Sequence, residues 1–551
     1  MALVLLVGSI AIGLLLVGLM AIGYLPALNA AKPTLAPLHA LLADARLLSS
    51  VGETVLAGFA ATLGASITAF FLVARASIRD AASTARQQRW AVAFMAVPHA
   101  ALGLGLAFLL APTGWLVRLI VGATGLDISA GAEFVSAKQG LLLALGLYLK
   151  ETPFLFLAMM AAQSHLAPQR QLTVAGAMGY SAPMAWIKIV LPQLYPLVRF
   201  PILAVLAYSH SVVDMSLLLG PTTPPTLPIL ILHWNNDPDL DQRFVAAAAS
   251  LLQVALVVGA LVLWLALERL ATLFLRGWIC NGRRHLPPML VLVLGPLARG
   301  WVWLCLALSF LSLLTLPVWS VAFAWRFPAL LPQQASFAFW ERALGEIGTP
   351  LVTSLALAAA VTVAALALAV ACLEHERRLT PEIVAAAERW LYLPLLVPEI
   401  SFLVGLQVLL LVIGLNGTWL AVAWLQLLFV FPYVFLSLKE PWRALDPRFE
   451  RIGLTLGAAP SRVFWRIKLP MLRGALAWSA AIGCAVSLSL YLPTLQGGEG
   501  RITTLATEAV TLGSGGDRRL AGIYGVLQAV ATALCLSLGL LAARSRWRAV
   551  R

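Results

Sequence analysis

The segment Arg451–Gly457 reads RIGLTLG and is followed, after nine further residues, by IKLP over Ile467–Pro470. An earlier stretch follows the same plan, with TVAGAMG over Thr173–Gly179, nine residues, and IVLP over Ile189–Pro192. The pattern of Gly, nine residues, Ile, one residue and Leu-Pro therefore occurs twice with identical spacing. A spaced pattern repeated at two distant places indicates an internal duplication.

The composition around these two loops is that of a membrane protein. The chain has 551 residues, of which 61% are hydrophobic and 11% charged, and its mean hydropathy is +0.90. Soluble domains carry about 25% charged residues. Runs of about 20 apolar residues recur, each long enough to cross a hydrocarbon layer of about 30 Å as a helix. We predict an all-α polytopic membrane protein with about 12 transmembrane helices in two parallel repeats of about six.

The expected spans divide evenly between the two halves of the chain. The first span has no basic segment before it and no small-residue cleavage site, so we interpret it as a retained helix and not as a signal peptide. The spans are expected near residues 2–25, 54–74, 90–110, 140–160, 198–220, 245–267, 301–324, 351–373, 390–413, 419–438, 474–495 and 520–543.

The charges predict the orientation of the chain in the membrane. The net charge is +14, but no basic stripe with interleaved aromatic residues suggests nucleic-acid binding. With the N-terminus inside, most Lys and Arg residues fall in cytoplasmic loops, as the positive-inside rule requires. We therefore expect both termini and both polar loops in the cytoplasm. The basic residues placed inside include Arg75, Arg79, Arg86, Arg89, Arg377, Arg378, Arg389, Arg544, Arg546, Arg548 and Arg551.

The two halves match outside the loops as well. Arg89-Trp90, Pro98 and Gly105 correspond to Arg389-Trp390, Pro398 and Gly405 at a constant offset of 300 residues, whereas the loops correspond at 278. The connection Ala111–Lys138, which is longer than Gly414–Thr418, accounts for the difference. Parallel repeats of this kind predict a pseudo-twofold axis along the membrane normal and a pathway between the halves.

These matches divide the chain into two transmembrane domains. We expect one at 1–270, with its motif-bearing core at about 50–270. The second is expected at 301–551, with its core at about 348–543, and a basic cytoplasmic linker at 271–300 joins the two.

The polar loops have the character of short exposed helices. Segments 172–180 and 449–458 combine helical propensity with small residues, which permit close approach of another surface. We expect the following Leu-Pro to stop or turn the helix before the next span. Two such helices on one face suit docking into a groove of a partner. The alternative interpretation is a pair of amphipathic connectors lying on the membrane surface.

Gly-x9-Ile-x-Leu-Pro resembles the core of the EAA loop in the membrane subunits of binding-protein-dependent ABC importers. The chain is similar in layout to fused permeases of the thiamine, ferric-iron and YnjC-like type, with both transmembrane domains on one polypeptide. The resemblance implies a type I importer fold in which each loop forms a coupling helix. The matching residues are Gly179, Ile189, Leu191 and Pro192 in one copy and Gly457, Ile467, Leu469 and Pro470 in the other.

The resemblance also implies a multi-pass protein of the bacterial inner membrane, and it implies partners. Two copies of a cytoplasmic ABC ATPase subunit and a periplasmic substrate-binding protein are expected. No Gly-x4-Gly-Lys-Ser/Thr phosphate loop occurs in the chain, so ATP and Mg²⁺ are expected on the ATPase and no cofactor on this chain. The family's Glu-Ala-Ala would fall at Thr173–Ala175 and Arg451–Gly453, so neither copy has the glutamate in register. Glu450 stands one residue early.

Ionisable residues within expected spans are candidates for the translocation path, because charge is costly in the membrane. Lys150 and Glu151, followed by Pro153, interrupt the fourth span; they line the path or gate it, or tie the helix to a neighbour. His210 and Asp214 are four residues apart and would share one helical face. They contact a polar substrate or form an ordinary interhelical pair.

Other chemistries find little support in the sequence. His99, His210 and Asp214 form no dense ligand set, so no metal site is expected, and no Gly-x-Ser-x-Gly or His-Glu-x-x-His motif suggests an enzyme. The alternative function is a 12-helix ion-coupled secondary transporter that uses Lys150, Glu151 and Asp214. The substrate is left open, because a fold does not determine it.

Overall fold

A computed structural model of the chain describes residues 2–26, 30, 32–78, 81–125 and 140–544. Outside these residues lie Arg79, Arg546, Arg548, Arg551 and residues 126–138 of the long connection Ala111–Lys138. The first half contains α1 (Ala2–Ala21), α2 (Ala36–Ala43), α3 (Leu47–Ile78), α4 (Ala81–Met95), α5 (His99–Leu110), α6 (Trp115–Thr124), α8 (Leu141–Gln163), the short turn η2 (Ser164–Leu166), α9 (Pro168–Ala177), α10 (Ala182–Ala185), the π-helical η3 (Trp186–Val190), α11 (Leu191–Ser211), α12 (Asp214–Leu219), α13 (Leu227–Asn235) and α14 (Gln242–Ile279).

The second half repeats this order of helices. It contains α15 (Pro288–Val321), the paired strands β1 (Ala322–Ala324) and β2 (Gln334–Ala335), α16 (Ala338–Glu376), α17 (Pro381–Leu391), η4 (Leu393–Leu395), α18 (Glu399–Val412), α19 (Trp419–Arg443), α20 (Arg448–Thr455), α21 (Pro460–Val463), the π-helical η5 (Phe464–Lys468), α22 (Leu469–Ser489), α23 (Leu492–Gly498), α24 (Leu505–Ser514) and α25 (Arg518–Arg544).

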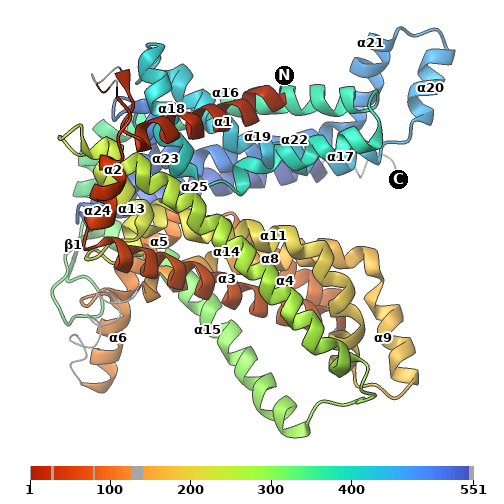
Figure 1. Cartoon of the computed structure of the whole chain (residues 1–551). Helices are drawn as coiled ribbons and strands as arrows, with labels where there is room; N and C mark the ends of the chain where they lie inside the picture. The colour runs from red at the N-terminus through yellow and green to blue at the C-terminus, as the bar shows by residue number, and fades with distance from the viewer. Residues whose placement is uncertain (1, 27–29, 31, 79–80, 126–139, 545–551) are drawn as a thin grey trace.

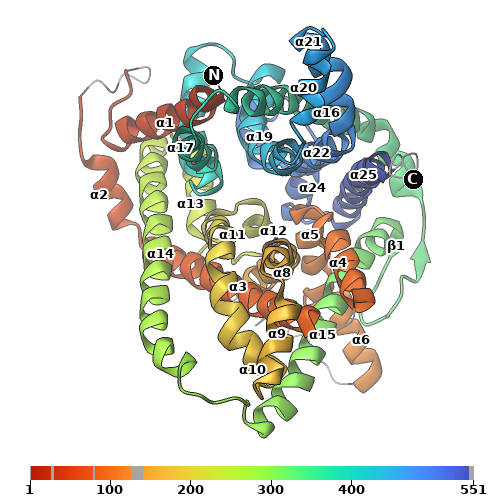
Figure 2. The ribbon, with the colours of Figure 1, turned by 90° about the vertical axis from the view of Figure 1, so that its right-hand side faces the viewer.

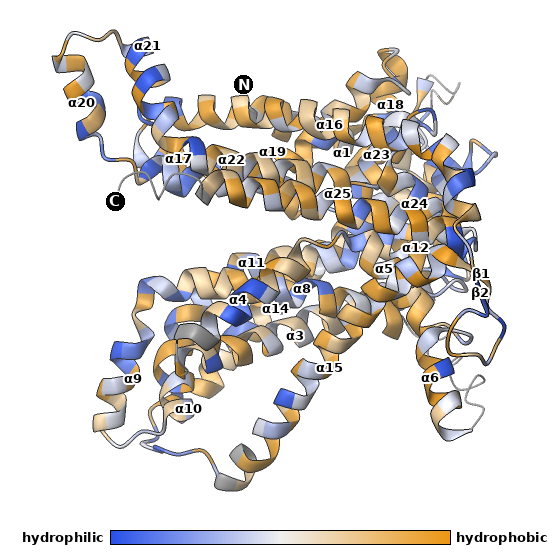
Figure 3. Ribbon diagram, turned by 180° about the vertical axis from the view of Figure 1, so that it is seen from behind, coloured by the Kyte–Doolittle hydropathy of each residue, from blue (hydrophilic) through white to orange (hydrophobic). Residues whose placement is uncertain are grey.

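The predicted class of fold is confirmed. Within the described ranges, 11 helices are long and apolar enough to cross a membrane, or up to 12 if the pair Pro381–Leu395 and Glu399–Val412, bent by 89°, is one span. Figure 3 shows that these long helices are mostly apolar along their length. The duplication is equally visible in the packing, because α3 packs on α8 as α16 packs on α19, and α13 on α14 as α24 on α25.

The two halves exchange their first helices. Helix α1 packs against α18 of the second half, and α15 packs against α5 of the first half. Both crossings are close at a glycine: a Cβ built on Gly405 would lie 2.0 Å from the carbonyl oxygen of Gly13, and one on Gly105 2.2 Å from that of Ser312. Helices in a membrane approach most closely where a residue has no side chain. The matched Gly105 and Gly405 therefore mark equivalent helix crossings.

Four expected spans are broken and one expected interruption is absent. In the first half, the span near 90–110 is divided at Pro98 between α4 and α5, and the span near 198–220 at Val212–Val213 between α11 and α12. In the second half, the spans near 390–413 and 474–495 are divided at the matching places, before α18 and between α22 and α23. By contrast α8 continues as a helix through Lys150, Glu151 and Pro153. The prediction that this sequence interrupts the fourth span is therefore wrong as regards the backbone.

The helices of the two halves lie close together at one end and diverge toward the end that carries α9 and α20 (Figures 1 and 3). Figure 2, seen from that end, places α9 and α10 on one side and α20 and α21 on the other. At the opposite end Arg118, 2% exposed, donates hydrogen bonds of 2.9 Å to the carbonyl oxygens of Arg326 and Ala329. Arg118 of the first half therefore binds the backbone of the second half between α15 and α16.

Candidate functional site

The glycine of each duplicated pattern ends a short helix. Gly179 follows α9 with φ +84°, and Gly457 follows α20 with φ +83°. The amide nitrogen of Tyr180 donates to the carbonyl oxygen of Ala175 over 3.0 Å, and that of Ala458 to Gly453 over 3.1 Å. This backbone turn needs a left-handed residue, which glycine supplies without a steric penalty. We name residues 168–192 the first loop and residues 448–470 the second loop.

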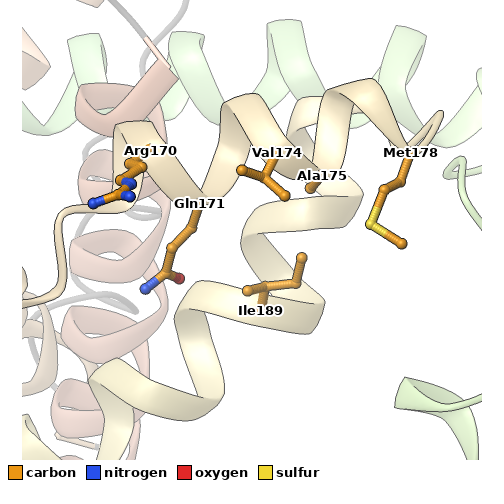
Figure 4. Close-up of a pocket in the computed structure, with 6 residues that line it drawn as sticks. All are labelled: Arg170, Gln171, Val174, Ala175, Met178 and Ile189. Atoms are coloured by element: carbon orange, nitrogen blue, oxygen red, sulfur yellow. The ribbon is translucent and has the colours of Figure 1, made fainter.

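The isoleucine of the pattern holds the short helix against the next one. Ile189 points toward α9 and, with Ala175, borders a shallow apolar groove (Figure 4). In the second loop, a Cβ built on Gly453 would lie only 2.8 Å from Cδ1 of Ile467. A small residue on the short helix and an isoleucine below it therefore make the same contact in both copies.

The Leu-Pro of the pattern does not end a helix, and that prediction is wrong. The chain is helical without interruption from Ala182 to Ser211 and from Pro460 to Ser489. In each copy five residues of π-helix, Trp186–Val190 or Phe464–Lys468, precede Leu-Pro. Proline lacks an amide hydrogen for the carbonyl four residues before it, and the wider π turn accommodates this loss.

Each short helix exposes two apolar side chains that the motif does not include. Val174 is 58% exposed and Met178 61% on the first loop, and Ile452 is 56% and Leu456 82% exposed on the second. Residues four apart lie on one face of a helix. The sequence analysis missed these pairs, although apolar residues at the same two positions of both polar loops were a readable signal.

The first loop is braced by the link between the two halves. Nζ of the buried Lys188 donates to Oδ1 of Asn281 over 2.8 Å and lies 5.2 Å from the centre of the Trp278 ring. The amide nitrogen of Ser181 donates to the carbonyl oxygen of Arg284 over 3.0 Å. Because α14 runs to Ile279 and α15 begins at Pro288, this short connection lies directly beside the loop.

The second loop is braced by ionic contacts. Nζ of Lys468, a side chain only 1% exposed, lies 3.2 Å from Oε1 of Glu450, contacts Glu374 and stands 4.6 Å from the centre of the Trp442 ring. Glu450 also pairs with Arg377. Burial raises the pKa of Glu450, but its contacts with Arg377 and Lys468 outweigh burial and hold the pKa below the ordinary value. The carboxylate of Glu450 is thus engaged by basic side chains of the same polypeptide.

Lys150 and Glu151 lie side by side on α8 but have separate partners. Nζ of Lys150 donates to the carbonyl oxygen of Met95 over 3.0 Å and to that of Val97, at the break between α4 and α5. Oε1 of Glu151 lies 3.3 Å from Nε2 of His99. Both residues are 7% exposed. The break in the helix thus supplies the carbonyl groups that hold the lysine.

His210 and Asp214 do not share a helical face, because the helix ends between them. His210, 1% exposed, turns toward α3, where its ring centroid lies 5.0 Å from that of Phe59 and Nδ1 lies 2.8 Å from the carbonyl oxygen of Leu206. Asp214 begins α12 and interacts electrostatically with His99 and Lys150. The structure therefore groups Asp214 with Lys150, Glu151 and His99, and leaves His210 apart.

Glu399 and two tyrosines complete this group from both halves. Glu399 opens α18 and interacts electrostatically with Asp214. Tyr208 of α11 interacts with Asp214 and Glu399, and Tyr433 of α19 with Glu151 and Glu399. The sequence analysis missed these residues, although Pro398-Glu399 stands 300 residues after Pro98-His99 and so occupies the matching place.

Comparison with known proteins gives relatives of one kind. The chain is 29% identical over 541 residues to the inner membrane ABC transporter permease protein YnjC of Escherichia coli (strain K12), a match that covers 96% of each chain. It is 28% identical over 173 residues to the molybdenum transport system permease protein ModB of Mycobacterium tuberculosis (strain ATCC 25618 / H37Rv), covering 28% of this chain and 66% of that protein. No protein-family model matches the chain.

Proposed function

We propose that this chain, a two-domain permease of an ABC transporter, imports its substrate by seating its two loops on two copies of a cytoplasmic ATPase subunit. The observation that carries this proposal is the exposed apolar pair on each loop, Val174 with Met178 and Ile452 with Leu456. Short helices with exposed apolar side chains on one face suit grooves of a partner. A periplasmic binding protein would deliver substrate at the opposite end, and ATP and Mg²⁺ would bind only to the ATPase.

The packing of the loops suits the transmission of force. Ile189 and Ile467 tie α9 and α20 to the helices that continue into α11 and α22. The helices of the two halves diverge toward the loop end (Figures 1 and 3). If ATP binding closes the ATPase pair, α9 and α20 approach each other and carry α11 and α22 with them. That end of the path would then close while the other end opens.

The test is co-purification of the full chain in mild detergent with the ATPase of its own organism. We expect two ATPase subunits per chain. Met178→Asp and Leu456→Asp should each weaken capture by about thirtyfold, the effect of removing an apolar anchor worth about 2 kcal/mol. The double variant should capture none.

Leu240→Asp is the matched control, because Leu240 is also exposed and apolar (46%) but lies before α14, at the opposite end. It should leave capture unchanged. Full capture by the double variant would contradict the assigned docking face. Uptake that survives ATP depletion but fails with an uncoupler would favour an ion-coupled transporter.

A further inference from the structure

A group of charged and aromatic side chains lies where the two halves meet, and none of its residues belongs to the first or the second loop. Glu151 and Asp214 come from the first half and Glu399 from the second, and Asp214 and Glu399 interact electrostatically. Tyr433 interacts with both Glu151 and Glu399. The group therefore crosses the boundary between the halves, where a translocation path would run. We name these four residues, with Tyr208, the central cluster.

The surroundings of Asp214 favour the binding of a ligand. Asp214 is 9% exposed, and within the described chain its carboxylate accepts hydrogen bonds only from backbone amides, that of Met215 over 2.8 Å. No cationic side chain lies within ion-pair distance of it in the described part of the chain. A buried carboxylate without a counter-ion is unfavourable, and in a membrane it usually marks an ion or substrate pathway.

The nearby positive groups are already engaged. Lys150 uses Nζ to bind the carbonyl oxygens of Met95 and Val97, and His99 lies on Glu151. Glu399 forms no ion pair among the described residues. Three carboxyl groups thus face one ammonium group and one imidazole, so acidic groups outnumber basic ones. Such a surface raises the local concentration of cations and excludes anions.

The aromatic side chains favour an organic cation. Tyr433 is 37% exposed, whereas Phe431 and Val434 beside it on α19 are 0% exposed, so the tyrosine faces open surface from a buried stretch of the helix. Tyrosine faces attract organic cations through their π electrons. The described residues contain no group of three or more His, Cys, Asp or Glu that could hold a metal ion. Carboxylates with tyrosines fit a protonated or quaternary amine better than a bare metal.

We infer that the central cluster is a binding site on the translocation path for a small organic cation. This inference rests on the proposed function, because it assumes that the path runs between the two halves. The carboxylates would attract the cation, Tyr208 and Tyr433 would contact its apolar surface, and Lys150 would prevent the site from holding it too tightly. An oxyanion would be repelled.

The test measures charge preference directly and needs no known substrate. Full-length Tyr433→Cys protein in membrane vesicles is treated with 2-(trimethylammonium)ethyl methanethiosulfonate, an organic cation, or 2-sulfonatoethyl methanethiosulfonate, an anion. Mass spectrometry follows modification of the introduced thiol and, as an internal reference, of the exposed native Cys280. Relative to Cys280, we expect the cation to be favoured about tenfold at the introduced thiol.

Glu399→Gln and Asp214→Asn should each reduce this preference severalfold, whereas Glu341→Gln, an exposed glutamate at the start of α16, should not. Tyr208→Cys, measured in the same way, covers the possibility that Tyr433→Cys fails to fold. Equal reaction of both reagents, a preference for the anion, or no reaction at either position would overturn the inference. Because no ATPase is present, these outcomes are independent of the co-purification test. If the ATPase is captured but the introduced thiol prefers the anion, the proposed importer function stands and only the inferred organic-cation site is rejected.

Discussion

The first and second loops share one backbone but are held in place by different chemistry. Both have a left-handed glycine, an isoleucine under a small residue and a π-helical turn before Leu-Pro. The first is braced by hydrogen bonds that Lys188 and Ser181 donate to Asn281 and Arg284, and the second by the ionic contacts of Lys468 and Glu450. The shape of the loops was kept after duplication while their supports diverged.

The chain offers a physical reason for the divergence. The link at 280–287 follows α14 and lies beside the first loop, where Asn281 and Arg284 accept hydrogen bonds from Lys188 and Ser181. Ser77 occupies the place of Arg377, 300 residues earlier, and bonds to Gln163 and Trp186 in place of a carboxylate. Each loop thus uses the groups that its own surroundings provide.

Lys468→Met should change the second loop more than any other substitution proposed here, and it tests whether the two loops are held by different contacts. It leaves the carboxylates of Glu374 and Glu450 without their buried ionic partner. Because Glu374 is partly exposed to solvent, we expect the second loop to lose about 2 kcal/mol of stability, less than for a fully buried pair. Hydrogen exchange over residues 448–456 should then rise about thirtyfold, with no change over 168–177. Arg466→Met, an exposed neighbour, is the control. Equal effects in both loops would mean that the ionic contacts do not brace the second loop specifically.

A smaller effect is expected from Asn281→Ala. Lys188 loses its hydrogen-bond acceptor, worth about 1 kcal/mol, so exchange over residues 168–180 should rise about fivefold. The second loop should not respond. Arg283→Ala is the control, since within the described chain its side chain makes no hydrogen bond or ion pair and its amide alone bonds Asn281. If only the control alters exchange, the link braces the loop through other contacts.

The smallest expected effect is the response to acid. The pKa of Glu450 is lowered in the folded protein, so its contribution to stability is fully present above the ordinary value of 4.5 and is lost as the pH falls through the lowered value. Between pH 5.5 and 3.5, exchange over 448–456, corrected for intrinsic rates, should rise by less than about tenfold. The first loop contains no Asp or Glu and should be unaffected. Glu450→Gln should abolish the response; an unchanged response would assign it to other carboxylates.

Sequence reasoning recovered the features that depend on local pattern. The duplication, the apolar spans and the helical character of the loops follow from spacing and composition. The effect of Leu-Pro was mispredicted, because a proline usually ends a helix and nothing in the sequence announces a π-helical turn. The pairing of His210 with Asp214 failed for a similar reason, since a helix break at Val212–Val213 has no glycine or proline to signal it.

Local features of the sequence specify which segments enter the membrane, where the copies match and which residues shape the loops, because hydropathy, spacing and glycine conformation act over short distances. The crossing of α1 and α15 to the opposite halves, at Gly405 and Gly105, is visible only in the packed structure. The same holds for the electrostatic interaction of Asp214 with Glu399, which are far apart in the chain. Such contacts depend on how helices pack, and helix packing is a property of pairs of surfaces that no single segment encodes.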